Sequence, residues 1–286
     1  MIKNFKLLYI IFLAIFSFSI NFYYANIGVL PIDTFAFFDT AYNILLDRHP
    51  FKDIWITTGP LVDYLQAVFF KIFGLNWTSY VIHGSFLNVV ITLSFFYTIL
   101  NFGLNKYLSL IYSVCLATLC YTISATPFAY IHSYVFSLLS IMVFFNSIKN
   151  KSKLSFLFLP VLMFLSFFCM QTPSTYINII ILFSLLIYFF NKFDLNLIFY
   201  FFLGSFFVIL IFTFYLFFLE IPIGSILQQY ILFPLSLGEY RLMGNEIAHI
   251  SFSERFTFRN LIGHFKFINL LIVLILGFTL SDIIKK

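Results

Sequence analysis

The chain has few charged residues. Only 9% of its 286 residues are Asp, Glu, Lys or Arg, whereas 62% are hydrophobic and 45 are Phe. Soluble domains carry roughly 25% charged residues, so this composition excludes an ordinary water-soluble domain. The net charge of +5 does not indicate nucleic acid as a partner, because the lysines form short groups between apolar runs.

Cysteine is also scarce. Cys115, Cys120 and Cys169 all lie within apolar runs, and their spacing matches no metal motif. We expect them to be small packing residues. The sequence predicts no cofactor and leaves a divalent metal requirement open.

Long uncharged runs predict transmembrane helices, each of which needs ~20 apolar residues. The runs 107–148 and 154–191 are long enough for two spans each, and each contains a proline near its middle. We therefore predict an all-α, polytopic integral membrane protein that forms a single domain over 1–286. Its eight expected spans are 7–25, 79–101, 107–125, 133–148, 154–170, 175–190, 197–219 and 267–281.

The lysines between the spans predict the orientation. If the N-terminus is cytoplasmic, nine lysines lie on the inner side, with only Asp194 and Asp282 as acids there. This distribution follows the positive-inside rule. Two large loops, 26–78 and 220–266, then lie outside, and the bacterial cytoplasmic membrane is the expected location.

The first outer loop is rich in carboxylates. It holds five of the eleven acidic residues, namely Asp33, Asp39, Asp47, Asp53 and Asp63. Charge is costly in lipid, so these residues indicate where the chain meets water and where chemistry is expected. From Thr34 to Asp47 we predict an amphipathic surface helix whose carboxylates face water. Its expected apolar face consists of Phe35, Phe38, Tyr42 and Leu45.

A second surface helix is predicted after Thr57-Thr58-Gly59-Pro60, with Thr58 or Gly59 as its cap and Gly74 at its end. Its expected apolar face consists of Leu61, Leu65, Val68 or Phe69, and Ile72, with Asp63 and Gln66 on the other side.

Several polar residues lie close to predicted span ends. His83 and His132 are expected to be hydrogen-bonded interfacial residues rather than ligands. Gln171 and Thr172 are expected to satisfy backbone groups freed by Pro173. In the second outer loop, Arg241, Arg255 and Arg259 indicate either an anionic ligand or lipid headgroups.

The first outer loop contains two motifs, Pro50-Phe51-Lys52-Asp53 and the run 59–74, which begins Gly59-Pro60-Leu61 and ends Ile72-Phe73-Gly74. Together with Asp33, they resemble motifs of the GT-C superfamily of membrane glycosyltransferases, which includes protein O-mannosyltransferases and lipid A aminoarabinose transferases. Asp33 stands where many bacterial members have the first acid of an Asp-Glu pair, although Thr34 follows it. The first motif is similar to P-Y-x-D, and the second is similar to G-P-L-x-x-Y-L-x-A-x-F-x-x-F-G. Gln171-Thr172 is similar to the family's K-Q-T element, and Phe233-Pro234-Leu235 is similar to its second-loop segment.

The resemblance implies a polyprenyl-phosphate-linked sugar as donor. The acceptor would be a hydroxyl of a glycan, lipid or protein on the outer face. In such a transfer one carboxylate takes the acceptor's proton, and cations stabilise the leaving phosphate. Asp33 is the implied base, with Asp39 as second choice. The implied substrate-binding residues are Asp53, Asp63, Gln171 and Arg241, of which Arg241 is the phosphate candidate.

Two other functions stay open. The missing acid after Asp33 and the short chain favour a non-catalytic or truncated membrane subunit with a transferase-like fold, and a partner membrane subunit could supply missing spans. A transporter or flippase would place ionisable residues inside its spans, and no Asp, Glu, Lys or Arg lies within the predicted ones.

Overall fold

The computed structural model describes residues 2–28, 31–242, 270 and 273. The chain divides into two compact units, Met1–Tyr230 and Ile231–Lys286. The described residues form helices, and the β-bridge between Pro50 and Ile54 is their sole strand-like pairing. The predicted all-α class is thus confirmed for this part of the chain, whereas a single domain over 1–286 stays a prediction.

Ten helices belong to the first unit. They are α1 (Ile2–Ala25), α2 (Pro31–Leu45), α3 (Leu61–Phe73), α4 (Trp77–Asn101), α5 (Lys106–Leu119), α6 (Ala129–Asn150), α7 (Lys153–Cys169), α8 (Gln171–Asn191), α9 (Leu195–Phe218) and α10 (Ile223–Ile226). A π-helical segment, Leu227–Leu232, then leads to α11 (Phe233–Leu242) of the second unit.

Five helices, α1, α4, α6, α8 and α9, are long and apolar enough to cross a membrane, and α5 and α7 are shorter apolar helices. Seven of the eight predicted spans therefore coincide with helices. The eighth, 267–281, lies outside the described residues apart from two positions, as does most of 220–266. The structure thus indicates a multi-pass helical membrane protein, and the count of eight spans stays a prediction.

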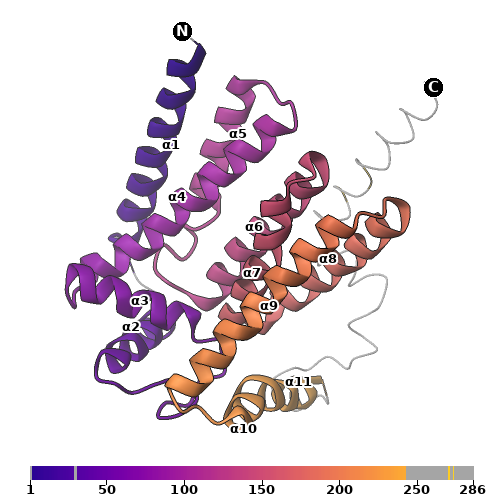
Figure 1. The fold of residues 1–286 in the computed structure, drawn as a ribbon. Coiled ribbons are helices and arrows are strands. Elements are labelled where there is room, and N and C mark those ends of the chain that lie inside the picture. Colours follow the sequence, from indigo (N-terminus) through magenta and orange to yellow (C-terminus); the bar gives the residue numbers. More distant parts are fainter. Residues whose placement is uncertain (1, 29–30, 243–269, 271–272, 274–286) are drawn as a thin grey trace. The chain divides into compact units, whose positions relative to one another are not determined.

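The main helices of the first unit run up and down between two ends (Figure 1). The start of α1 and the turns α4–α5, α6–α7 and α8–α9 lie at one end, which we call the lysine end. It carries Lys106, Lys149, Lys151, Lys153 and Lys192. Helices α2, α3 and α10 lie at the opposite end, which we call the acidic end because most of the first-loop carboxylates are there.

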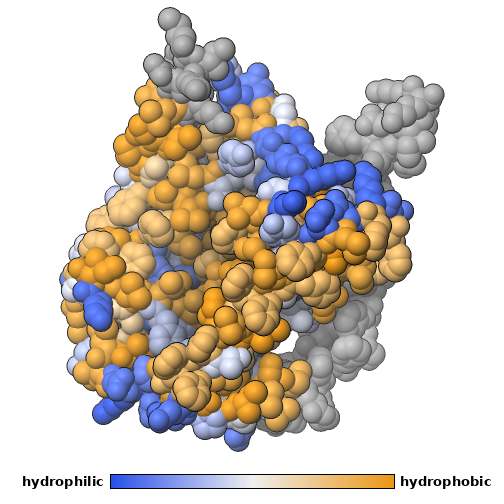
Figure 2. All heavy atoms as spheres, in the orientation of Figure 1, coloured by the Kyte–Doolittle hydropathy of each residue, from blue (hydrophilic) through white to orange (hydrophobic). Residues whose placement is uncertain are grey.

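Apolar side chains cover the flanks of these helices. On the face drawn in Figure 2, hydrophobic residues predominate and hydrophilic residues gather mainly towards the ends. Large residues of α8 and α9 are exposed, including Phe190 at 88% and Phe217 at 74%. Water-soluble monomers rarely expose contiguous apolar surface of this kind, whereas lipid tails accept it.

Hydrogen bonds from polar side chains connect the helices inside the first unit. The Asn88 amide donates to the carbonyls of Ser17 on α1 and Ala117 on α5, at 2.9 and 3.0 Å. Asn21 of α1 donates to Ser85 of α4 at 3.1 Å. Such interhelical hydrogen bonds are typical of membrane bundles, where burial of apolar surface does not drive helix association.

The buried sides of α2 and α3 are not the apolar faces that the sequence analysis named. In α3, Asp63 and Gln66 are buried, whereas Val68 and Ile72 of the expected apolar face are 53% and 66% exposed. In α2, Phe35, Tyr42 and Leu45 are likewise exposed, and Thr34, Phe37 and Ala41 are buried. In α3 the polar side is therefore the one that packs against the protein. Asp39 of α2 and Asp47, which follows the helix, are exposed, as expected. The outward apolar side chains of both helices can meet lipid in place of water.

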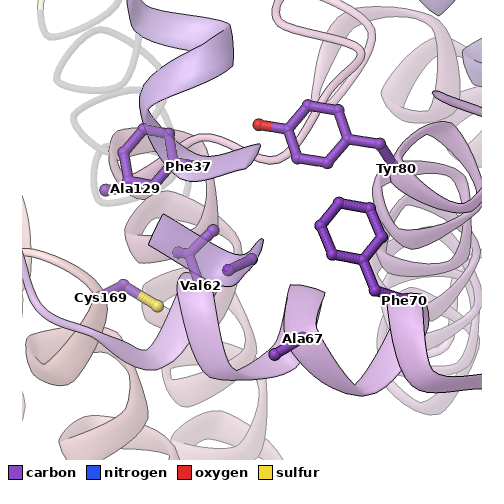
Figure 3. Close-up of a cluster of buried hydrophobic side chains, with 8 residues drawn as sticks. Phe37, Val62, Ala67, Phe70, Tyr80, Ala129 and Cys169 are labelled. Atoms are coloured by element: carbon purple, nitrogen blue, oxygen red, sulfur yellow. The ribbon is translucent and has the colours of Figure 1, made fainter. Parts of the chain in front are cut away.

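The buried sides of α2 and α3 share one hydrophobic cluster with α4, α6 and α7 (Figure 3). Phe37, Val62 and Phe70 pack in it beside Tyr80. The Tyr80 hydroxyl lies 2.7 Å from the Thr34 carbonyl and 3.0 Å from the Pro127 carbonyl, so its single proton is shared between these two acceptors. Tyr80 thus fixes the start of α2 against the segment before α6.

Candidate functional site

A cavity of about 420 Å³ lies at the acidic end of the first unit. Its walls come from α2, from the segment 55–58, from the start of α3, from 128–130 at the start of α6 and from Met170 between α7 and α8. It brings together Asp33 and Asp63, which are 30 positions apart in the sequence. Cavities of ~300–1,000 Å³ with few polar groups are typical of small-molecule sites.

Helix α2 presents one face to this cavity. Asp33, Ala36, Phe37 and Thr40 line it at positions i, i+3, i+4 and i+7, which lie on the same side of a helix. Asp33 is exposed and Phe37 is buried, so this face runs from a water-accessible carboxylate to an apolar wall.

The segment before α3 is held against the end of α7. The Gly59 N–H donates to the Cys169 carbonyl at 2.9 Å, which satisfies one of the carbonyls left over where α7 ends. A Cβ atom at position 59 would lie 1.9 Å from the Phe168 carbonyl oxygen, so only glycine fits this contact. The neighbouring Thr57 and Thr58 line the cavity, and their place depends on this close approach.

The Gln171 side chain also holds the segment 55–58 in place. Its amide nitrogen donates to the Thr57 carbonyl at 2.9 Å and to the Tyr230 carbonyl at 2.6 Å. The expectation that Gln171 satisfies groups freed by Pro173 was therefore wrong for its side chain. Gln171 supports the cavity wall from behind, and it is not itself among the lining residues.

Asp63 is the buried carboxyl of the cavity. It is 2% exposed, and burial raises its pKa well above the usual range, while its own backbone N–H opposes this shift more weakly. The two ion pairs found among the described residues, His49–Asp47 and Lys52–Glu220, do not include it. Burial without a cationic partner favours the protonated form, which donates a hydrogen bond as well as accepting one.

The other predicted site residues lie elsewhere. Asp39 is exposed on α2 away from the cavity, where the Asn43 amide donates to its carboxylate at 3.3 Å. The Asp53 carboxylate accepts from the His49 N–H at 2.8 Å and closes the turn that the bridge between Pro50 and Ile54 spans. Arg241 lies on α11 of the second unit, and its side chain is outside the described residues. Of the predicted site residues, the structure therefore brings Asp33 and Asp63 together in the cavity. Gln171 supports the cavity wall through its hydrogen bond to Thr57.

The sequence analysis missed a buried polar chain next to the cavity. Gln66, one turn after Asp63, lies 2.9 Å from His83 Nδ1, and the Nε2 atoms of His83 and His132 lie 3.1 Å apart. His132 Nδ1 lies 3.0 Å from the Tyr121 hydroxyl. The two histidines were expected to be hydrogen-bonded, which is confirmed. Both side chains are buried within the protein, at 2% and 0% exposure, and their expected position at the membrane interface stays a prediction.

No group of three or more His, Cys, Asp or Glu residues is positioned to hold a metal ion in the described part of the chain. The three cysteines are free thiols, of which only Cys169 is buried. Comparisons with protein-family models, with curated proteins and with solved structures find no match for this chain. The functional argument therefore rests on the cavity and on the residues that shape it.

Proposed function

We propose that the protein is a membrane glycosyltransferase of the GT-C kind. It would move a sugar from a polyprenyl-phosphate-linked donor to a hydroxyl of a glycan, lipid or protein. The observation that carries this proposal is the shared cavity of Asp33 and Asp63 at the acidic end of an apolar helix bundle. A site at that place can meet a donor held in lipid and an acceptor that arrives from water.

The two carboxyls suit different roles in this transfer. Asp33 is exposed, so an acceptor hydroxyl can reach it from water. In the proposed step Asp33 takes the hydroxyl proton while the acceptor oxygen forms a bond to the anomeric carbon. The bond from that carbon to the phosphate oxygen breaks, and its electron pair leaves with the polyprenyl phosphate. Asp63, whose protonated form is favoured by burial, would donate a hydrogen bond that orients the acceptor.

We infer the orientation of the proposed enzyme from the charged residues at its two ends. Lysines gather at the lysine end and carboxylates at the acidic end, which supports a cytoplasmic N-terminus and an external cavity. We place the protein in the bacterial cytoplasmic membrane. Arg241 remains the proposed phosphate contact, because a guanidinium binds phosphate in a bidentate manner.

The test uses cells that lack the endogenous gene and carry wild type, Asp33→Asn, Asp63→Asn or Asp47→Asn at matched membrane levels. Mass spectrometry of surface glycans and lipid-linked saccharides reads the result. Wild type and Asp47→Asn should add the same sugar mass, and Asp33→Asn should lose it. Asp47 is the matched control, because its side chain is 97% exposed and it does not line the cavity.

Other outcomes redirect the proposal. If Asp33→Asn adds the sugar as wild type does, Asp33 is not the base, and Asp39→Asn is the next variant to examine. If no chain changes any glycan or lipid-linked saccharide, the transferase proposal fails. A non-catalytic membrane subunit would then be the better interpretation, followed by a transporter or flippase.

A further inference from the structure

We infer that the cavity binds an uncharged sugar ring, as the acceptor, and that the donor phosphate lies outside it. This inference rests on the proposed transferase function and adds the chemical class of the ligand. It follows from the charge of the cavity walls, from one buried carboxyl and from the aromatic side chains around it.

The walls of the cavity carry acids and no bases. Asp33 and Asp63 are the ionisable carboxyls, and none of the lining residues in the described part of the chain is Lys, Arg or His. A phosphate or a sugar carboxylate placed here would meet like charge at Asp33 with no cation to offset it. The lining therefore selects against anionic ligands.

The polar groups of the walls match sugar hydroxyls. Asp63 lines the cavity and is 2% exposed, and its carboxyl bonds to its own backbone N–H. A carboxyl has more than one hydrogen-bonding position, so a ligand that reaches Asp63 can still donate to it and, when it is protonated, accept from it. A sugar hydroxyl does both, and the hydroxyls of Thr40, Thr57 and Thr58 offer further partners.

Aromatic residues provide the remaining surface. Trp55 and Tyr130 line the cavity and are 54% and 42% exposed, and Phe37 and Phe128 line it further in. A sugar ring has C–H groups on its faces and hydroxyls around its edge. It can therefore pack against aromatic rings while the carboxyls and hydroxyls bind its edge.

Trp55 also supplies the probe for a test, because the chain has only two tryptophans, Trp55 and Trp77. Trp77 does not line the cavity. Trp77→Phe leaves a chain whose fluorescence reports on the cavity, and Trp55→Phe leaves one that does not. Both are placed in phosphatidylcholine nanodiscs, which avoids sugar-based detergents. The probes are methyl glycosides of glucose, mannose and galactose, together with glucuronic acid and glucose 6-phosphate as anionic counterparts.

At least one methyl glycoside should change the fluorescence of Trp77→Phe saturably and leave that of Trp55→Phe unchanged. The anionic ligands should need concentrations at least about tenfold higher. Adding Asp33→Asn to Trp77→Phe should reduce the difference in affinity between neutral and anionic ligands, and adding Asp47→Asn should leave that difference unchanged. Equal or tighter binding of an anionic ligand overturns the inference, and so does the absence of a saturable response to every neutral glycoside.

The binding test and the cell test have distinguishable outcomes, because either one can fail while the other succeeds. If neutral glycosides bind but no chain transfers sugar in cells, the ligand class stands and the transferase proposal falls. If cells show Asp33-dependent transfer but the cavity binds no neutral glycoside, the transferase proposal stands and the acceptor must bind elsewhere.

Discussion

His83 of α4 and His132 of α6 face each other with their Nε2 atoms 3.1 Å apart. Both side chains are buried, and both helices are long and apolar enough to cross a membrane. Gln66 of α3 is hydrogen-bonded to His83, so the hydrogen bonds of the histidine pair connect α3 to α4 and α6. Asp63 lies on the same buried side of α3 as Gln66, so the histidine pair also fixes the helix that carries the buried carboxyl of the cavity.

Two neutral arrangements of protons are compatible with the contacts between Tyr121, His132, His83 and Gln66. In the first, Tyr121 donates to His132, His132 donates to His83, and His83 donates to the Gln66 carbonyl oxygen. In the second, His132 donates to the Phe128 carbonyl, which lies 3.1 Å away, and His83 donates to His132. The Gln66 amide is then rotated, so its nitrogen, which otherwise has no hydrogen-bond partner, donates to His83.

His132→Phe should destabilise the protein through this pair. The substitution leaves His83 Nε2 and the Tyr121 hydroxyl buried without their partner, and each such group costs about 1–3 kcal/mol. Tyr121→Phe is the matched control, because it removes one hydroxyl and leaves the histidine pair intact. Its expected loss is about 0.5–1.5 kcal/mol. Unfolding by SDS in mixed micelles measures both, and a smaller loss for His132→Phe than for Tyr121→Phe would contradict the hydrogen-bonded pair.

Gly59→Ala should displace the cavity wall. The added methyl group would overlap the Phe168 carbonyl oxygen, which belongs to a helix backbone and cannot rotate away. Overpacking of this kind costs typically about 1–3 kcal/mol. Gly28→Ala is the control, since nothing lies within 4 Å of a Cβ atom there. Stability in mixed micelles should fall only for Gly59→Ala, and an equal effect of both variants would show that the Gly59 contact is not restrictive.

The sequence was sufficient for the features that depend on local chemistry. Apolar runs located the long helices, and Gly74 ends α3 with a φ of 86° and an N–H bonded to the Phe70 carbonyl. The break at 169–173 was likewise expected from Pro173. α5 is shorter than its predicted span, because it ends at Leu119 rather than 125. Helix ends depend on tertiary contacts as well as on local propensity, which explains this difference.

The site could be predicted only in part, because it depends on contacts between distant segments. Asp33 and Asp63 were both singled out, yet nothing in their spacing showed that they share a cavity. The contact between His83 and His132 joins residues 49 positions apart. The inward sides of α2 and α3 could not be read from amphipathic pattern alone, since lipid and protein interior are both apolar.

Gln171→Glu should be more harmful than Gln171→Ala. The alanine variant leaves the Thr57 and Tyr230 carbonyls without their donor, whereas the glutamate variant places a negative oxygen against both. Protonated glutamate can donate to one of the two carbonyls, so the glutamate variant should recover relative to alanine as the pH falls. Thermal unfolding at about pH 7.5 and about pH 3.5 tests this, because these values lie above and below the usual glutamate pKa of about 4.3. A pH-independent difference between the two variants would show that Gln171 does not act as the donor.

Asp63 should make stability depend on pH in a direction opposite to that of an ion-paired carboxylate. Burial raises its folded-state pKa well above the unfolded value. Above about pH 4 the unfolded chain loses this proton and the folded chain keeps it. The stability contribution is therefore full below that pH and declines as the pH rises towards the folded-state pKa, by at most about 1.4 kcal/mol per pH unit.

Asp63→Asn isolates this effect, because it keeps the shape of the side chain and removes its titration. The free energy of unfolding of wild type minus that of Asp63→Asn should fall as the pH rises from about 4.5 to 8. The same difference for Asp47→Asn should stay nearly constant, since the Asp47 side chain is 97% exposed. A difference for Asp63→Asn that rises with pH would mean that the carboxyl is ionised in the folded protein. Asp63 would then need a cationic partner, and its proposed role as a hydrogen-bond donor to the acceptor would fall.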